Sequence, residues 1–314
     1  MVESVEILVP SFNRPVLLCE AVSSALSQDY PHLSVIVSDN HSEFDVDRAL
    51  GGLSKDGRLK IFKNEVNLGM RGNWHSLLYN LASAKWVMIL SDDDVLLDPG
   101  YITKVMKLVA NHKSVALIWS NYSILNEVNG STTSTNYELP PIVSGKEYFA
   151  GYQKQYPHIH STMSVVFRRQ LAINVGAFQT DILGLDTDLW LKLMKEGDVG
   201  FIGDVSSMYR VHPANQQTTN VDLEKDLENA RCLMKVVASY RGELSLKDLQ
   251  DVESRIIERF FWWRLSQLSK SRERSKVASY IRSFVECFPY LKSSFVSRKG
   301  IHFMARRLLS FFGR

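Results

Sequence analysis

Three consecutive carboxylates, Asp92, Asp93 and Asp94, end an apolar run in the stretch VMILSDDDV (87–95). Adjacent acids repel one another, and a solvated turn or a helix start needs only one or two of them. A positively charged partner is therefore expected beside these side chains. The alternative is an ordinary helix N-terminus, where the helix dipole favours acidic residues.

Polar side chains recur where other apolar runs of the first half end. They are Asn13 and Arg14, Asp39 and Asn40, and Asn64 and Asn67. In open α/β sheets, ligands bind beyond the carboxyl ends of the strands. If the apolar runs are strands of one sheet, these side chains and the three acids face a common binding edge.

The first 120 residues alternate short apolar runs with segments of helical periodicity, which predicts a sheet of parallel strands crossed over by helices. The predicted strands are 5–11, 34–40, 59–64, 86–92 and 115–120, and the predicted helices are 16–28, 44–54, 71–83 and 99–112.

After residue 121 the alternation loosens. We expect a polar loop at 126–141, an apolar run at 164–169, an amphipathic helix at 184–197 and a pair of strands at 199–203 and 205–211. From residue 222 the apolar spacing of three and four is typical of helices.

The composition is that of a globular protein, with 45% hydrophobic and 23% charged residues in a chain of 314. The three cysteines are scattered, which supports neither a disulfide framework nor a thiolate metal site and favours the cytoplasm. No signal peptide and no membrane-spanning segment is expected.

The net charge of +3 is unevenly distributed. Residues 270–314 contain eleven Lys or Arg and two Glu, a net charge of +9, so the other 269 residues carry −6. This asymmetry indicates that the basic C-terminal segment and the acidic remainder of the chain have different physical roles.

Six segments occur in an order that resembles the family 2 glycosyltransferases of the GT-A fold, over about residues 5 to 213. They are ILVPSFNR, VSDN, NLGMRGNW, SDDDV, GLDTDLWLKL and YRVHP. The resemblance implies an α/β fold, a Rossmann-like mixed sheet flanked by helices, in a catalytic domain at 1–221. Its nucleotide-sugar half would be about 1–120 and its acceptor half about 121–221, with 222–314 as a helical C-terminal appendage.

By this resemblance, Asp92 and Asp94 are the D-x-D residues that hold a divalent cation against the donor diphosphate, and His212 is a further contact to the metal. Carboxylate oxygens suit Mg²⁺ or Mn²⁺. Asp93 is expected to face the sugar or a nearby backbone.

The resemblance also assigns a nucleotide site. Asp39 would accept a hydrogen bond from the ring N–H of uracil or thymine, which predicts a UDP- or dTDP-sugar donor and disfavours cytosine. The other residues assigned to the donor are Pro10, Phe12, Asn13, Arg14, Asn67, Gly69, Asn73, Asp92 and Asp93. Gly69 would permit a backbone turn with positive φ.

Asp186 corresponds to the general base that takes a proton from the acceptor hydroxyl. The residue before it is Leu185 where the family often has Glu, which leaves Asp188 as the alternative base. Residues 186 and 188 point about 200° apart on a helix, so both cannot face one site.

The implied function is a metal-dependent, inverting hexosyltransferase that acts on a glycan or lipid-linked glycan acceptor, as in O-antigen or capsule synthesis. The alternatives are a magnesium-dependent phosphatase of the haloacid dehalogenase type and a non-catalytic carbohydrate-binding relative. A dinucleotide-dependent dehydrogenase is disfavoured because the sequence lacks G-x-G-x-x-G.

The last segment, 298–314, forms a basic amphipathic pattern. It predicts either a membrane-surface helix, which would place the protein peripherally at the inner face of the plasma membrane, or a helix packed on the catalytic domain or on a second copy of the chain. No aromatic and basic nucleic-acid module is evident, so no nucleic-acid partner is expected.

Overall fold

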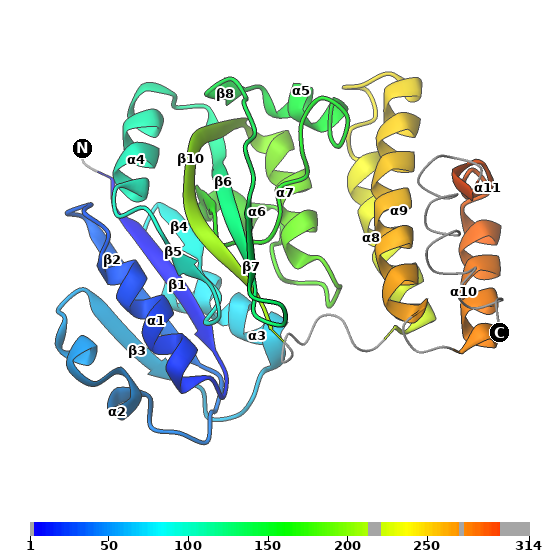
Figure 1. The fold of residues 1–314 in the computed structure, drawn as a ribbon. Helices are drawn as coiled ribbons and strands as arrows, with labels where there is room; N and C mark the ends of the chain where they lie inside the picture. The colour runs from blue at the N-terminus through cyan, green and yellow to red at the C-terminus, as the bar shows by residue number, and fades with distance from the viewer. Residues whose placement is uncertain (1–2, 213–220, 270–272, 296–314) are drawn as a thin grey trace. The chain divides into compact units, whose positions relative to one another are not determined.

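The computed structural model of the protein describes residues 3–212, 221–269 and 273–295 (Figure 1). The chain divides into two compact units. The sheet unit comprises Met1–Phe149 and Gln155–Pro213, and the helical unit comprises Ala150–Lys154 and Ala214–Arg314. The segment 298–314 lies outside the described residues.

One mixed β-sheet, with ten strands among the described residues, forms the centre of the sheet unit. Its main path runs β3-β2-β1-β4-β9-β6-β10-β5, with β7 paired to β6 and β8 to β10. The strands are β1 (Val5–Ser11), β2 (Leu33–Asp39), β3 (Leu59–Lys63), β4 (Trp86–Ile89), β5 (Val95–Leu96), β6 (Val115–Asn126), β7 (Ser131–Ser134), β8 (Ile142–Val143), β9 (Val165–Arg168) and β10 (Asp198–Val211). This confirms the predicted class, an α/β fold with a mixed sheet.

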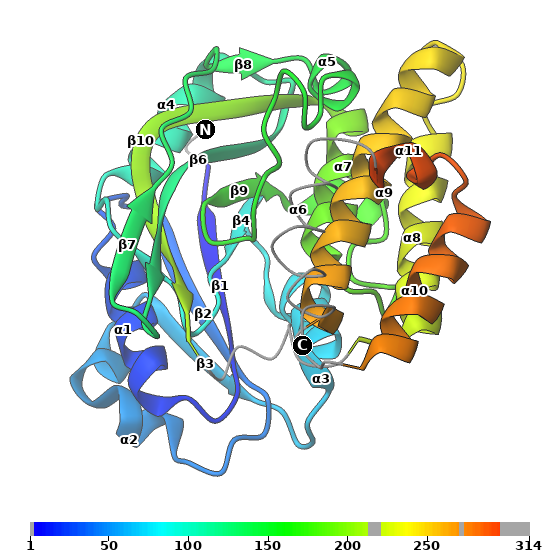
Figure 2. The same cartoon turned by 45° about the vertical axis from the view of Figure 1, so that its right-hand side comes forward.

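Helices cover both faces of this sheet (Figures 1 and 2). Val5, Ile7 and Val9 of β1 point to the face where the apolar sides of α1, α2 and α4 pack. Glu6 points to the other face, where its buried carboxylate accepts the N–H groups of Ser83 and Ala84 at 2.6 and 2.8 Å. The helical segments of the unit are α1 (Pro15–Leu26), α2 (Val46–Leu50), η1 (Gly51–Lys55), α3 (Gly69–Ser76), η2 (Leu77–Leu81), α4 (Tyr101–Asn111), α5 (Gly145–Ala150), α6 (Arg169–Asn174) and α7 (Leu185–Glu196).

Strands β1 to β4 are parallel to one another, so their carboxyl ends lie at the same edge of the sheet. The sequence predicted this arrangement because short apolar runs alternate with helical segments; β1, β2 and β4 are mostly buried, whereas β3 is partly exposed. The polar residues after these strands are therefore brought to one edge.

Two details of the second half differ from the predictions. The strands expected at 199–203 and 205–211 are one strand, β10, because both halves pair with β6 and the ladder absorbs the irregularity as register shifts between Ile202 and Ser207. The loop expected at 126–141 contains β7, whose hydroxyl-rich residues pair with the extended end of β6. The Oγ atoms of Ser123 and Ser134 lie 2.7 Å apart across this pair.

The helical unit contains α8 (Leu223–Ala238), α9 (Leu246–Leu268), α10 (Arg274–Cys287) and α11 (Leu291–Phe295). Its apolar core includes Ile257, Phe261 and Phe284. A buried polar group lies within this core: Asp226 Oδ2 accepts the Nε–H of Arg264 at 2.8 Å and the hydroxyl of Tyr280 at 2.9 Å. Asp226 and Arg264 are both fully buried.

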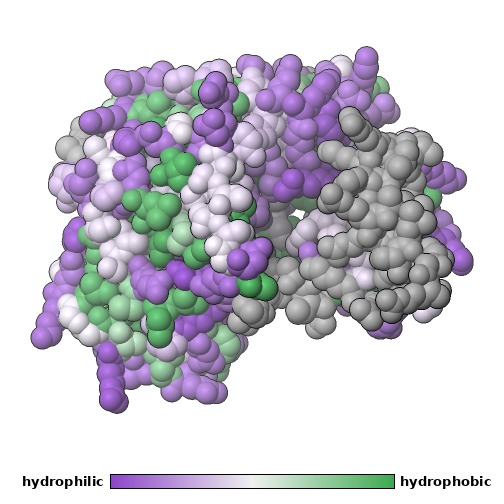
Figure 3. Space-filling view, viewed as in Figure 1, coloured by the Kyte–Doolittle hydropathy of each residue, from purple (hydrophilic) through white to green (hydrophobic). Residues whose placement is uncertain are grey.

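Apolar side chains are exposed around the connection from β3 to α3. They are Phe62, Val66, Leu68 and Met70. Figure 3 shows that, on the face in view, hydrophobic residues gather in separate patches among hydrophilic ones. In the part of the chain that the structure describes, no helix combines the length and apolar character needed to span a membrane.

Candidate active site

The three carboxylates after β4 form a buried acid loop. Asp92, Asp93 and Asp94 are 4%, 8% and 1% exposed. The N–H of Leu90 donates to the carbonyl of Leu8 at 2.9 Å, which continues the β1–β4 pairing up to the loop. The acids therefore lie beside the end of β1 rather than on a solvated helix start.

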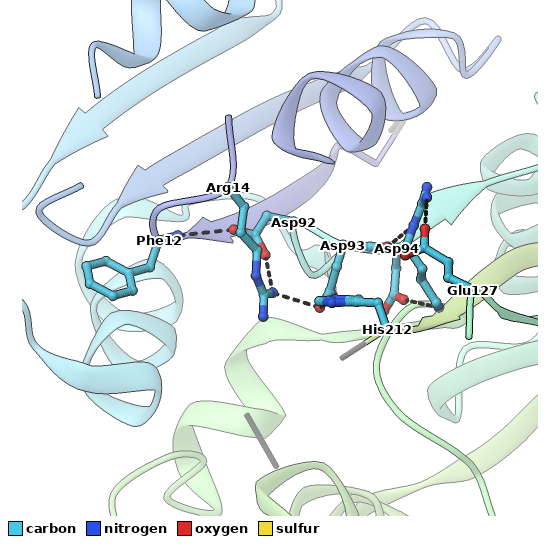
Figure 4. A network of polar contacts seen from close by, with 8 residues as sticks. Phe12, Arg14, Asp92, Asp93, Asp94, Glu127 and His212 are labelled. Atoms are coloured by element: carbon cyan, nitrogen blue, oxygen red, sulfur yellow. Dashed lines mark hydrogen bonds and ion pairs between the residues drawn. The ribbon is translucent and has the colours of Figure 1, made fainter. Parts of the chain in front are cut away.

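Arg14 supplies the positive partner expected from the sequence (Figure 4). Its Nη1 lies 2.9 Å from Asp92 Oδ1 and 2.7 Å from Asp93 Oδ2. The second oxygen of Asp92 accepts the N–H of Phe12 at 3.1 Å. Burial raises the pKa of Asp92 above its ordinary value, although the charge of Arg14 opposes this shift.

Asp94 is held differently. Its Oδ1 accepts the backbone N–H of Arg210 at 3.0 Å, whereas its buried Oδ2 has no hydrogen-bond partner among the described residues. Burial, followed by the charge of Asp93, raises the pKa of Asp94 well above its ordinary value. A buried carboxylate oxygen without a donor is costly unless a cation or a proton joins it, so this atom fits a hard metal ion.

His212 lies at the same loop, with its Nε2 3.2 Å from Asp93 Oδ2 (Figure 4). The structure thus brings Asp92, Asp94 and His212 to one place. It does not assemble them into a metal cage: across residues 3–212, 221–269 and 273–295, no group of three or more His, Cys, Asp or Glu side chains is arranged to hold a metal. Asp92 faces Arg14, and His212 contacts Asp93.

The loop after β1 leads from Pro10 and Phe12 to Asn13, whose φ of 54° is unusual for a residue other than glycine. The N–H of Asn13 donates to Ser42 Oγ at 2.8 Å, and its Oδ1 accepts the N–H of Glu43 at 2.9 Å. These bonds hold the loops after β1 and β2 together. Strained backbone of this kind is frequent at functional sites.

Asp39, at the end of β2, is fully buried. Its two oxygens accept the N–H of Ser42 at 3.2 and 3.3 Å, and Lys63 Nζ lies 3.8 Å from Oδ2. Ser42 and Lys63 carry no signal in the sequence that would mark them as partners of Asp39. Lys63 ends β3, so its closeness to Asp39 follows only from the pairing of β2 with β3.

An amide network connects the loops after β2 and β3. Asn67 Oδ1 accepts from Asn40 Nδ2 and from the N–H of Gly69, both at 2.8 Å. Gly69 has a φ of 70°, which confirms the predicted positive-φ turn. Asn73 is buried and directs its amide to Ser38 of β2, with bonds of 2.6 and 3.0 Å. Asn73 therefore connects α3 to the end of β2.

The two candidate bases lie at the start of α7. Asp188 is buried and pairs with Lys192 Nζ at 2.6 Å, and burial raises its pKa. Asp186 is half-buried. Burial and the charges of Asp94, Asp93 and Asp186, in that order, raise the pKa of the Tyr209 hydroxyl to about 12. The charges of Asp186, Asp93 and Asp94 thus act on the same hydroxyl.

Comparison with known proteins agrees with this arrangement. The family model described as Glycosyl transferase family 2 matches residues 6–173, more than half of the chain. The chain belongs to glycosyl transferase family 2. This membership argues against the haloacid dehalogenase alternative.

One relative in the family is the GalNAc(5)-diNAcBac-PP-undecaprenol beta-1,3-glucosyltransferase of Campylobacter jejuni, which is 31% identical over 209 residues. The match covers 65% of this chain and 64% of that enzyme, so the chain spans somewhat less than two thirds of its length.

Two solved structures share the fold. S. aureus TarS 1–349 in complex with UDP has a TM-score of 0.70 at 16% identity, over 91% of this chain and 81% of that one. The mannosyltransferase PcManGT of Pyrobaculum calidifontis, in complex with GDP-Man and Mn²⁺, has a TM-score of 0.58 at 15% identity, over 98% and 85%. The GT-A fold expected for this family 2 member is confirmed.

Proposed function

We propose that the protein is a metal-dependent, inverting glycosyltransferase that transfers a sugar from a UDP- or dTDP-sugar to a lipid-linked glycan. The observation that carries this proposal is the buried Oδ2 of Asp94, which has no hydrogen-bond partner in the described part of the chain and lies in a loop of three acids at the ends of parallel strands. The neighbours described with UDP or with GDP-Man and Mn²⁺ support a nucleotide-sugar donor.

In this proposal the residues after β1 to β4 bind the donor. Asp39 accepts a hydrogen bond from the base. The segments that surround the nucleoside carry Pro10, Phe12, Asn13, Asn67 and Gly69. Asn73 supports these segments through its hydrogen bonds to Ser38. Arg14 already contacts two carboxylates and is placed to exchange one of them for a phosphate oxygen.

Asp92, Asp94 and His212 would hold a Mn²⁺ or Mg²⁺ ion, which supplies Lewis-acid stabilisation of the charge on the leaving diphosphate. Asp94 is the strongest of these candidates because one of its oxygens has no hydrogen-bond partner within residues 3–212, 221–269 and 273–295, whereas both oxygens of Asp92 already accept hydrogen bonds. Asp93 orients Arg14 and His212.

Asp186 is the proposed general base. It would accept the proton of the acceptor hydroxyl while that oxygen attacks the anomeric carbon from the side opposite the nucleoside diphosphate. Asp188 is the weaker candidate because Lys192 already pairs with its carboxylate. One displacement of this kind inverts the anomeric centre.

The lipid-linked acceptor is proposed from the name of the Campylobacter jejuni relative, whose substrate carries undecaprenol. An O-antigen or capsule precursor is the corresponding class of product. Such an acceptor supports peripheral attachment of the protein to the inner face of the plasma membrane. The basic composition of the segment 298–314 supports the same location.

A nucleotide-sugar screen tests this proposal. Thermal unfolding would be recorded with UDP-, dTDP- and GDP-sugars, each with and without Mn²⁺, because a ligand that binds the folded state raises its apparent stability. We expect a uridine or thymidine donor to raise the Tm when Mn²⁺ is present. Binding without slow donor hydrolysis or transfer would instead favour a non-catalytic carbohydrate-binding protein.

A further inference from the structure

Arg210 is a second arginine, besides Arg14, that binds the acid loop. It lies near the end of β10, and its side chain is 11% exposed. Its backbone N–H donates to Asp94 Oδ1 at 3.0 Å, and its Nε–H donates to the carbonyl of Asp93, also at 3.0 Å. One residue thus holds both the carboxylate of Asp94 and the main chain beside it.

Two glutamates anchor the rest of the Arg210 guanidinium. Nη1 donates to Glu127 Oε1 at 2.8 Å, and Nη2 donates to Glu20 Oε2 at 2.5 Å. Glu20 lies on α1, and Glu127 directly follows β6. The acid loop is therefore tied through Arg210 to elements that are distant in sequence.

These anchors also determine which part of Arg210 contacts Asp94. Both terminal nitrogens donate to the two glutamates, and the backbone N–H of Arg210 donates to Asp94 Oδ1. Among the described residues, neither the guanidinium nor any other group makes a hydrogen bond to Asp94 Oδ2. Arg210 thus orients the Asp94 carboxylate and leaves Oδ2 available to a ligand.

If Glu20 and Glu127 had a purely structural role, replacing them would change the stability of the protein only slightly. The side chains of Glu20 and Glu127 are 48% and 37% exposed, and ion pairs at such positions usually contribute little to stability. A role in positioning makes a different prediction, because small displacements of a ligand-binding atom weaken binding far more than they weaken the fold.

We propose that Arg210, anchored by Glu20 and Glu127, is a positioning residue that presents Asp94 Oδ2 to the cation and diphosphate of the donor. This inference rests on the proposed function of the acid loop. It assigns to the Glu20–Arg210–Glu127 group, defined by these contacts, a role in donor affinity rather than in acceptor binding.

The test compares Glu20→Gln/Glu127→Gln with a control of equal charge change, Glu138→Gln/Glu196→Gln, in which both residues are exposed. Hydrogen exchange of a peptide covering residues 90–97 reports on the acid loop without any ligand. Electron paramagnetic resonance of Mn²⁺, titrated with UDP present, reports on affinity. Steady-state kinetics separates the KM values for donor and acceptor.

We expect the anchor variant to unfold within a few degrees of wild type, to exchange faster in the acid loop, and to bind Mn²⁺ with UDP roughly tenfold more weakly. The acceptor KM should stay unchanged, and the control should behave as wild type. Arg210→Lys, which keeps the charge but cannot make the same set of bonds, should show the same loss.

Equal Mn²⁺ affinity in the anchor variant and wild type would overturn the inference, as would an equal loss in the control. If the wild-type protein binds neither Mn²⁺ nor UDP, the proposed function is wrong. The exchange measurement still decides whether the anchors order the loop, because it needs no ligand, and unchanged exchange would reject the positioning role independently.

Discussion

At the scale of single residues, the acid loop combines features that oppose stability. Its carboxylates are buried and mutually repulsive, and Arg14 offsets the charge of Asp92 and Asp93. One oxygen of Asp94 has no donor among the residues that the structure describes. Proteins tolerate such arrangements where function requires them. The loop should therefore be the place where stability and activity conflict most directly.

Asp94→Asn tests this conflict. Because burial raises the pKa of Asp94 above 3.8, its contribution to stability is full below that value and is lost as the pH rises through the folded-state pKa. Without metal, the variant should gain stability relative to wild type as the pH rises from about 4 to about 8, because wild type must lose a proton from the buried Asp94 and the variant has none to lose there. Urea unfolding at several pH values measures this change, and a stability difference between the two proteins that is the same at about pH 4 and about pH 8 would contradict it.

Asp186→Asn should lower kcat by about 10² to 10⁴-fold while the donor still binds, because it removes the proposed proton acceptor and little else. The matched control is Asp188→Asn, two residues along the same helix, which should retain most activity. Single-turnover kinetics with saturating donor measures both variants. If Asp188→Asn is the inactive one, the assignment of the base is reversed.

At the scale of elements, the sequence predicted what depends on local pattern. Strands β1 to β4 and helix α7 follow from apolar runs and periodicity, because burial on both faces or on one stripe leaves a direct trace in the residue types. The strand β7 leaves no such trace, since its exposed Ser and Thr residues are held by pairing with β6. The continuity of β10 likewise depends on its partner strand.

In the candidate site too, the sequence predicts what depends on local pattern and not what depends on partners in the fold. Asp92, Asp93, Asp94, Asp39 and Asp186 stand out as acids after strands or at a helix start. The role of Arg210 could not be predicted, because its partners Glu20 and Glu127 meet it only in the folded sheet. The sequence YRVHP drew attention to His212, two residues further on.

In the helical unit, the buried Asp226–Arg264 pair gives an element-scale prediction. Asp226→Ala leaves the guanidinium of Arg264 buried without its carboxylate and should cost about 3–5 kcal/mol in the free energy of unfolding. Asp226→Leu combined with Arg264→Met removes both charges and should be nearly neutral or stabilising. Chemical unfolding followed by circular dichroism compares them, and similar losses in both variants would contradict the expectation.

At the scale of the whole molecule, charge is the clearest feature that the sequence records and the described structure does not explain. About half of the +9 segment at 270–314, including residues 296–314, lies outside the described residues. Its proposed role at a membrane surface and the alternative role in self-association both stay predictions, as do the domain limits 1–221 and 222–314.

Vesicle binding by the full chain tests the membrane role. Arg306→Gln/Arg307→Gln should weaken binding to anionic phosphatidylserine vesicles by roughly tenfold or more, since each basic residue near such a surface contributes about 1 kcal/mol. Co-sedimentation over a range of lipid concentrations measures the change, with neutral phosphatidylcholine vesicles as the control. Equal binding of wild type to both lipids would favour the packed helix instead.

The most direct test of the central claim is calorimetric titration of UDP into the wild-type protein and into Asp94→Asn, each with and without Mn²⁺. The acid loop as a metal-dependent diphosphate site predicts that wild type binds UDP much more tightly when Mn²⁺ is present and that Asp94→Asn loses this gain. Wild-type protein that binds UDP equally with and without Mn²⁺, or a variant that keeps the full gain, would contradict it.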